Sequence, residues 1–309
     1  MIEIKNISKS FGALKALNNL SIKVEKGEFY SLLGPNGAGK TSCINMIGGL
    51  LQASSGDIFI DGKSVFKESK AIKSKIGIVP QEIALYNDLS ALENLRFWGK
   101  INGVKKEHLS ARIEQILAFL DLSAHQQKNI STFSGGMKRR INIAAALLHE
   151  PQVLFMDEPT VGIDPQSRLF IYEIFEKLHQ QGITIFYTSH NMEEVERLSD
   201  RIGIIDHGQL IAEGSMTQLK KEHHLHESLE ISWKAQAIPT LLEPWLKENF
   251  ASYSLQKNQL NIDSHKPTQD LVIILQQLEK HGLHVQSAEV KKVNLESLFL
   301  ALTGKKLRE

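Results

Sequence analysis

The sequence predicts an α/β fold for about the first two-thirds of the chain and a smaller α+β domain for the rest. Up to about residue 220, short continuous apolar runs alternate with amphipathic helical patterns, which is typical of an α/β domain. After residue 228 the order of these patterns changes. A chain of 309 residues is also long enough for two domains.

Composition and charge are those of an ordinary globular protein, with 42% hydrophobic and 23% charged residues. The formal net charge is +1, and we interpret the basic run at residues 138–140 as a solvated helix flank, so no nucleic-acid partner is expected. The single cysteine, Cys43, excludes an intramolecular disulfide and fits a reducing compartment. The N-terminus lacks the apolar core of a signal peptide, and no apolar run approaches the roughly 18 residues of a membrane-spanning helix. We therefore expect a soluble, cytoplasmic protein.

Strands and helices alternate in the first domain. Leu20, Ile22 and Val24 alternate with polar residues, which predicts a half-buried strand. Continuous apolar runs predict buried strands at residues 29–34, 76–80, 153–157 and 184–189. Amphipathic patterns predict helices at residues 40–51, 110–120, 135–148, 165–180 and 192–198. Residues 201–214 are expected to form a hairpin that turns at His207 and Gly208.

A polar, histidine-rich stretch, "LKKEHHLHES" at 219–228, separates the predicted domains at 1–220 and 228–309. Its histidines lack cysteine or acidic partners at ligand spacing, so we interpret the stretch as a solvated linker and not as a metal site. The second domain shows strand, helix, two strands, helix and strand patterns at 229–233, 239–249, 252–256, 259–263, 268–281 and 283–290. This βαββαβ order predicts a small ferredoxin-like α+β domain, followed by a helix at 294–304.

A phosphate-binding loop follows the strand at 29–34. "GPNGAGKTS" at 34–42 matches G-x-x-x-x-G-K-[ST], with a strand before it and a helix after it. Glycines let backbone N–H groups converge on phosphate oxygens, Lys40 reaches the outer phosphates, and the Thr41 hydroxyl can bind Mg²⁺. The expected nucleotide-binding residues of this loop are Gly34, Pro35, Asn36, Gly37, Ala38, Gly39, Lys40, Thr41 and Ser42.

Two adjacent carboxylates follow the apolar strand at 153–157. In an α/β sheet, ligands bind at the carboxyl ends of the strands. We therefore expect Asp157 to hold Mg²⁺, directly or through water, and Glu158 to activate the attacking water as general base.

A third motif, "FSGGM" at 133–137, lies between these two in the sequence. Two glycines at a helix start are unusual, because a helix-interior glycine costs about 1 kcal/mol relative to alanine. Ser134, Gly135 and Gly136 have the chemistry of a second phosphate clamp: a hydroxyl, bare backbone N–H groups and a helix N-terminus.

With these three motifs in this order, residues 1 to about 220 resemble the nucleotide-binding subunit of an ABC transporter. The resemblance implies a P-loop NTPase fold of the ABC ATPase type, with a mixed sheet core and a helical subdomain. It implies ATP and Mg²⁺ as cofactors, and a homodimer or heterodimer of ATPase subunits. Ser134, Gly135 and Gly136 would then face the ATP of the partner subunit, and the two glycines, which lack side chains, would leave room for its γ-phosphate.

Four further residues take their expected roles from this resemblance. Phe11 stands where the family stacks an aromatic ring on adenine. Gln81 matches the glutamine that touches Mg²⁺ and the attacking water. His190 matches the catalytic histidine that contacts the terminal phosphate. Asp164 matches the loop that spans the subunit interface, although an N-cap before Pro165 explains it as well.

The pairing of "SGGMKRR" with "TVGIDPQSR", and a terminal "LESLFLALTG" at 295–304, is similar to the branch that serves drug and antibiotic exporters. That resemblance implies a separate membrane permease, engaged near Gln81 and residues 82–99, and a peripheral location on the inner face of the cell membrane. Phe133, Met137 and Ala53 depart from the commoner family residues but have no chemical role. A soluble regulatory ABC ATPase and a DNA-repair ATPase remain open alternatives, although the single phosphate loop and the lack of heptad runs argue against them. The transported substrate is not predicted.

Overall fold

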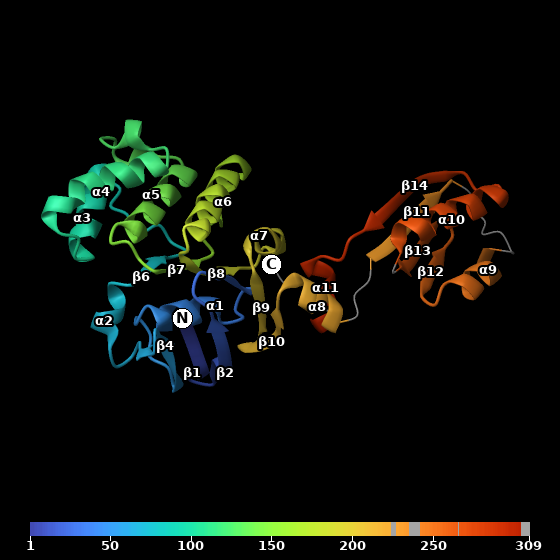
Figure 1. Cartoon of the computed structure of the whole chain (residues 1–309), viewed down its shortest axis with the longest axis horizontal. Helices are drawn as coiled ribbons and strands as arrows, with labels where there is room; N and C mark the ends of the chain where they lie inside the picture. The colour runs from blue at the N-terminus through green and yellow to red at the C-terminus, as the bar shows by residue number, and fades with distance from the viewer. Residues whose placement is uncertain (224–226, 235–241, 265, 304–309) are drawn as a thin grey trace. The chain divides into compact units, whose positions relative to one another are not determined.

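The computed structural model describes residues 1–223, 227–234, 242–264 and 266–303, except for the side chain of Lys70. These residues form two compact units, one over Met1–Met216 and the other from Thr217 onward (Figure 1). Three residues of the histidine-rich stretch, 224–226, and the end of the predicted last helix, Gly304, lie outside the described residues.

The first unit contains two sheets. The larger is six-stranded in the order β10-β9-β3-β8-β7-β6, with parallel neighbours except for the antiparallel pair of β9 and β10. The smaller is antiparallel in the order β2-β1-β4-β5. The strands are β1 Ile2–Phe11, β2 Leu14–Val24, β3 Phe29–Leu33, β4 Ser55–Ile60, β5 Lys63–Ser64, β6 Ile76–Val79, β7 Val153–Asp157, β8 Thr184–Ser189, β9 Arg201–Asp206 and β10 Gln209–Gly214. This mixed arrangement confirms the predicted α/β sheet core, and the pair of β9 and β10 confirms the hairpin.

Helices cover the larger sheet, and α3, α4 and α5 form the helical subdomain above β6 and β7 in Figure 1. The helices are α1 Lys40–Ile47, α2 Ser69–Lys73, α3 Ala91–Ile101, α4 Lys106–Phe119, α5 Gly135–Leu147, α6 Pro165–Gln180 and α7 Met192–Leu198, with short 3₁₀ turns η1 Ser123–His125 and η2 Ile130–Thr132. The predicted helical subdomain is therefore confirmed.

The core has two layers because successive strand residues point to opposite faces of the sheet. Leu154 and Ile185, on β7 and β8, belong to the apolar cluster shared with α3, α4, α5 and α6. Phe155 and Phe186 belong to the cluster shared with α1 and the antiparallel sheet. The packing of α1 against both sheets holds its N-terminus at the carboxyl ends of β3, β7 and β8.

Some element bounds differ from the sequence predictions. The helix expected over 40–51 ends at Ile47, because the chain turns at Gly48 and Gly49 adopts a positive φ of 70°. Helix α4 begins at Lys106, before the predicted start at Ser110. Strands β1 and β4 and helix α3 were not predicted from the sequence, although α3 carries a capping box in which Ser90 and Glu93 bond reciprocally.

The second unit contains an antiparallel four-stranded sheet in the order β12-β13-β11-β14. Its elements are β11 Glu227–Trp233, α9 Leu242–Asn249, β12 Tyr253–Gln256, β13 Gln259–Ser264, α10 Pro267–Lys280, β14 Val285–Lys291 and α11 Leu295–Thr303, while α8 Met216–Glu222 begins at the boundary between the units. Leu246 and Ile274, from α9 and α10, pack with Ile231 and Ile262 in a core of their own. No helix among the described residues is both long and apolar enough to cross a membrane.

Candidate functional site

The loop between β3 and α1 is built around close backbone contacts. A Cβ atom on Gly34 would lie 2.3 Å from the carbonyl oxygen of Ile205. Gly39 has a φ of +107°, and a Cβ there would lie 2.5 Å from the carbonyl oxygen of Ala16. Side chains are therefore excluded at both ends of the loop, and Lys40 begins α1 directly after it.

Lys40 is almost fully buried beneath this loop, with a side chain only 4% exposed. Its Nζ donates hydrogen bonds to the carbonyl oxygens of Gly34, at 2.8 Å, and Pro35, at 3.0 Å. The same Nζ lies 3.0 Å from Oε1 of Glu158 at the end of β7. The lysine and the predicted general base, 118 positions apart in the printed sequence, thus form one buried ion pair.

Glu158 also contacts the predicted catalytic histidine. Its Oε2 lies 3.0 Å from Nδ1 of His190, which follows β8. Glu158 holds a positive φ of 43°, and its N–H donates to the Thr188 carbonyl at 3.1 Å. Glu158 therefore contacts both Lys40 and His190 at the carboxyl ends of the parallel strands.

Asp157 is oriented by a residue that the sequence analysis missed. Thr188 pairs with Asp157 across β7 and β8, and its Oγ1 donates a hydrogen bond of 2.6 Å to Asp157 Oδ1. Both side chains are buried. A polar residue at the carboxyl end of an otherwise apolar strand, in "TIFYTS", was the available signal.

A cleft of about 360 Å³ opens beside these residues. The predicted residues that line it are Phe11, Asn36, Gly37, Gly39, Lys40, Thr41, Ser42, Gln81 and Glu158, and Leu14 and Ala16 were not predicted. Pro35 and Ala38 are buried residues of the same loop. Phe11 is 48% exposed at the cleft, and Lys9 Nζ lies over one face of its ring, 5.1 Å from the ring centroid.

The donor set at the cleft suits Mg²⁺ that binds together with phosphate. Thr41 and Gln81 bring a hydroxyl and an amide oxygen to the lining, and the Asp157 carboxylate lies directly beside Glu158 in the chain. Among the described residues, no group of three or more His, Cys, Asp or Glu side chains forms a metal site. Mg²⁺ is commonly held by one or two carboxylates plus substrate phosphates, so these residues fit an ion that the nucleotide completes.

Ser134, Gly135, Gly136 and Asp164 do not line this cleft. Ser134 is exposed and caps α5, where its Oγ accepts from the Met137 N–H at 3.2 Å. Asp164 is exposed and caps α6, accepting from the Ser167 N–H at 2.9 Å, and these hydrogen bonds lower the pKa of its carboxyl. The structure therefore places the third motif beside the α6 N-terminus and away from the phosphate loop of the same chain.

A buried carboxylate, Glu194 on α7, joins the segments that follow Glu158 and precede His190. It accepts hydrogen bonds from Thr160 Oγ1 at 2.7 Å, Tyr187 Oη at 2.7 Å and Ser189 Oγ at 3.1 Å. Nothing in the local sequence singles out Glu194, because its donors come from two separate places in the chain, the segment after β7 and strand β8.

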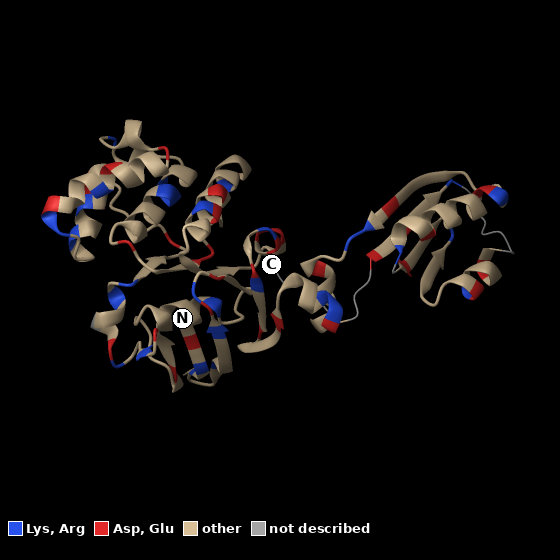
Figure 2. Ribbon diagram, in the orientation of Figure 1, with Lys and Arg blue, Asp and Glu red and all other residues tan. Residues whose placement is uncertain are grey.

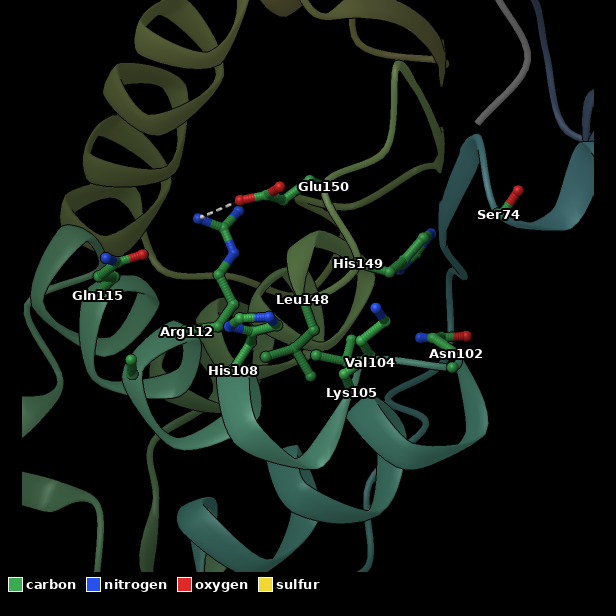
Figure 3. A pocket seen from close by; sticks show the side chains of 12 residues that line it. Ser74, Asn102, Val104, Lys105, His108, Arg112, Gln115, Leu148, His149 and Glu150 are labelled. Atoms are coloured by element: carbon green, nitrogen blue, oxygen red, sulfur yellow. Dashed lines mark ion pairs between the residues drawn. The ribbon is translucent and has the colours of Figure 1, made fainter.

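A second pocket, of about 490 Å³, contains none of the predicted site residues. It lies beside the start of α4 and the end of α5, where Arg112 forms an ion pair of 3.3 Å with the exposed Glu150 (Figure 3). Lysine and arginine are interspersed with aspartate and glutamate over the described ribbons of each unit (Figure 2). The expectation that the chain has no nucleic-acid partner stays a prediction.

The chain is similar to known ATP-binding proteins of ABC transporters. Residues 17–161 match the family model described as ABC transporter. A linearmycin resistance ATP-binding protein of Bacillus subtilis is 44% identical, and the alignment covers 100% of both chains. A daunorubicin resistance ATP-binding protein of Streptomyces coeruleorubidus is 31% identical over 98% of this chain and 96% of its own. A Nod factor export ATP-binding protein of Cupriavidus metallidurans is 33% identical over 100% and 99%.

Solved structures agree. An ATP-binding subunit of an ABC transporter has a TM-score of 0.66 at 27% identity, covering 72% of this chain and 93% of its own. A dimeric ATP-binding cassette in a post-hydrolysis state, bound to ADP and Pi, has a TM-score of 0.64 at 27% identity, covering 70% and 99%.

Proposed function

The chain belongs to the ABC transporter ATP-binding proteins, and we propose that it hydrolyses ATP within a dimer to drive export through a separate membrane permease. The partner in the dimer is a second copy of this chain or a homologous subunit. The complex holds the chain as a peripheral protein on the inner face of the cell membrane.

One observation supports a dimer: two segments with the chemistry to bind phosphate lie apart in the same chain. Lys40 and the glycine loop line one cleft, while Ser134 and Gly135 are exposed at the N-terminus of a 13-residue helix outside it. Helix N-termini favour anions. A head-to-tail dimer supplies that anion, because two-fold symmetry sets the Ser134 cluster of each chain against the nucleotide of the other. Asp164, beside this cluster, then also lies at the interface.

The cleft residues take complementary roles toward ATP. Phe11 stacks on adenine, the residues from Gly34 to Ser42 bind the phosphates, and the γ-phosphate replaces Glu158 at Lys40 Nζ. Thr41, Gln81 and Asp157 would hold Mg²⁺, which would neutralise phosphate charge when bound.

Release from Lys40 leaves the Glu158 carboxylate available as a base. Water attacks the γ-phosphorus in line with the bond to the bridging oxygen, Glu158 accepts the proton, and ADP and phosphate leave. His190, 3.0 Å from Glu158, contacts the terminal phosphate and stabilises its developing charge.

The relatives support export as the coupled process. Two are named for resistance to linearmycin and daunorubicin, and one for Nod factor export. The segment after Gln81 offers a surface for the permease, since the half-exposed Tyr86 ring packs at 4.9 Å from the Phe97 ring on α3. A soluble regulatory ATPase would lack such a partner, so co-purification from detergent-solubilised membranes separates the two functions.

A mixing experiment tests the shared sites. Lys40→Ala removes the phosphate contact and Ser134→Arg blocks the partner's nucleotide, so each variant should be inactive alone. A mixed dimer carries both defects in one site and leaves the other intact. We expect mixing to restore part of the ATPase activity and to trap nucleotide at one site per dimer.

The control is to mix each variant with itself under the same conditions, which should restore nothing. If mixed dimers, verified by two affinity tags, neither trap nucleotide nor hydrolyse it, the shared-site proposal fails.

A further inference from the structure

Arg139, on α5, is a buried cation whose hydrogen bonds go to backbone. It is only 2% exposed. Its Nη1 donates to the Pro80 carbonyl at 2.7 Å and its Nη2 to the Gln81 carbonyl at 2.5 Å. The third guanidinium nitrogen, Nε, is buried and has no hydrogen-bond partner among the described residues.

These two carbonyls carry the compensation for the buried charge. Burial lowers the pKa of Arg139 to about 10, which still leaves the guanidinium charged at neutral pH. A buried charge is costly unless its donors are used, and the planar guanidinium fixes the direction of each donor. If the segment after β6 that contains Pro80 and Gln81 moved away, Arg139 would be left buried without these acceptors. The arginine and this loop therefore hold each other in place.

The same face of α5 contacts the loop a second time. Asn142, three residues beyond Arg139, accepts a hydrogen bond of 3.3 Å from the Ala84 N–H. The Ala84 carbonyl in turn accepts from Trp98 Nε1 on α3 at 3.1 Å. The loop backbone is thus fastened to the helical subdomain from Pro80 to Ala84.

The held residue faces the nucleotide cleft. Gln81 is exposed and lines the cleft together with Thr41 and Glu158. The helix that holds its backbone begins one residue after Ser134. One rigid helix therefore connects the exposed Ser134 cluster to the backbone of a cleft residue.

We propose that Arg139 is a positioning residue for Gln81. It ties the loop at residues 80–84, the Gln81 loop, to α5, so that the Gln81 amide meets the attacking water and the metal at the correct place. The proposal rests on the proposed function for the part that concerns hydrolysis. Arg139 itself touches neither nucleotide nor water in this role.

The first test is hydrogen exchange in the full-length chain, which needs no activity. In Arg139→Gln, the Ala84 and Tyr86 amides, which are hydrogen-bonded to Asn142 and Asn94, should exchange at least about tenfold faster than in the parent. Amides of β7 and β8 should keep their parent rates. Arg139→Lys, which keeps a cation but loses the two-pronged geometry, should fall between the two.

The matched control is Arg140→Gln. Arg140 lies on the same helix and donates to the Leu120 carbonyl at 3.0 Å, far from the Gln81 loop in sequence. Its loss should leave exchange at Ala84 and Tyr86 unchanged. Parent-like exchange at these amides in Arg139→Gln, or equal acceleration in Arg140→Gln, would overturn the positioning role.

The second test is a kinetic double-mutant cycle with Gln81→Ala. Because misplacing a reacting contact by about 1 Å can cost roughly 100-fold, Arg139→Gln should lower kcat by about 10- to 100-fold with the KM for ATP within about threefold. In the Gln81→Ala background the same change should cost less than about threefold more, and Arg139→Lys should recover part of the rate.

Additive losses in this cycle would refute the action through Gln81. A parent chain that hydrolyses no ATP, alone or with a permease, would instead count against the proposed function, and the exchange experiment would still decide the role of Arg139.

Discussion

Glu158 occupies the space between the two groups that are proposed to meet the terminal phosphate. Its two carboxylate oxygens lie 3.0 Å from Lys40 Nζ and 3.0 Å from His190 Nδ1. A glutamate this deeply buried repels an incoming phosphate and competes with it for the lysine. In the proposed function, ATP binding therefore separates Glu158 from Lys40, and we propose that this step prepares the carboxylate as a base.

We predict that Glu158→Gln hydrolyses ATP about 100- to 10,000-fold more slowly, because the base is lost. Its affinity for ATP should equal or exceed that of the parent, since the neutral amide neither pairs with Lys40 nor repels phosphate. Equilibrium binding of ATP and a single-turnover assay measure the two effects separately.

Because Glu158→Gln binds ATP but hydrolyses it slowly, it should persist as an ATP-bound dimer on a sizing column. The parent should return to monomers as it hydrolyses ATP. Near-normal turnover by Glu158→Gln would assign the base to another residue. Lys40→Ala serves as the comparison, because it should lose ATP binding instead.

At the scale of elements, the two glycines of the third motif have different reasons to be glycine. A Cβ on Gly136 would lie 2.3 Å from Ser167 Oγ, because α5 packs closely against the N-terminus of α6. A Cβ on Gly135 would meet nothing closer than 3.8 Å. The expectation that both glycines make room for a partner's phosphate stays a prediction, and for Gly136 the packing of α5 on α6 is a second reason that suffices by itself.

We predict that Gly136→Ala lowers the free energy of unfolding by about 1–3 kcal/mol, as overpacking does. Gly135→Ala should leave it unchanged or raise it by up to about 1 kcal/mol, because alanine favours the helix. Gly135→Ala should nevertheless lower ATPase activity, since its methyl group faces the proposed partner nucleotide. Urea denaturation and steady-state hydrolysis check these outcomes.

A compensating change makes the packing argument specific. Ser167→Gly removes the atoms that clash with the added methyl group. In the Gly136→Ala chain it should therefore raise the free energy of unfolding, and by more than the same substitution changes it in the parent. Equal stability of Gly135→Ala and Gly136→Ala would contradict the explanation.

At the scale of the whole molecule, the chain divides between Met216 and Thr217. Every residue of the proposed nucleotide site precedes that point, and the second unit has its own core around Ile231 and Ile274. We therefore propose that the residues from 228 to 309 form an accessory domain that takes no part in nucleotide chemistry.

A chain shortened after Glu222 should remain soluble and bind ATP with an affinity within about threefold of the parent, since no cleft residue is removed. Isothermal titration with a non-hydrolysable ATP analogue measures this. A shortened chain with parent-like circular dichroism that no longer binds the analogue would refute the division of labour.

The sequence by itself determined the chemistry of each motif. Each of the three motifs is a contiguous segment: the phosphate loop, the Asp157-Glu158 pair and "FSGGM". The spacing within each segment therefore specifies which donors and acceptors appear together. The continuous apolar runs also predicted the central strands, because a strand buried on both faces is apolar at every position. Strand β1 was not predicted, because the exposed residues Lys5 and Asn6 interrupt its apolar pattern.

Only the tertiary structure decided which of these groups meet. Thr188 orients Asp157 because β7 and β8 are neighbours in the sheet, and Arg139 reaches Gln81 because α5 packs against the loop after β6. Such contacts join residues about 30 to 60 positions apart, and strand order and helix packing set them. The separation of Ser134 from Lys40 has the same origin: the fold buries Lys40 at the cleft and leaves Ser134 exposed outside it, which no local pattern encodes.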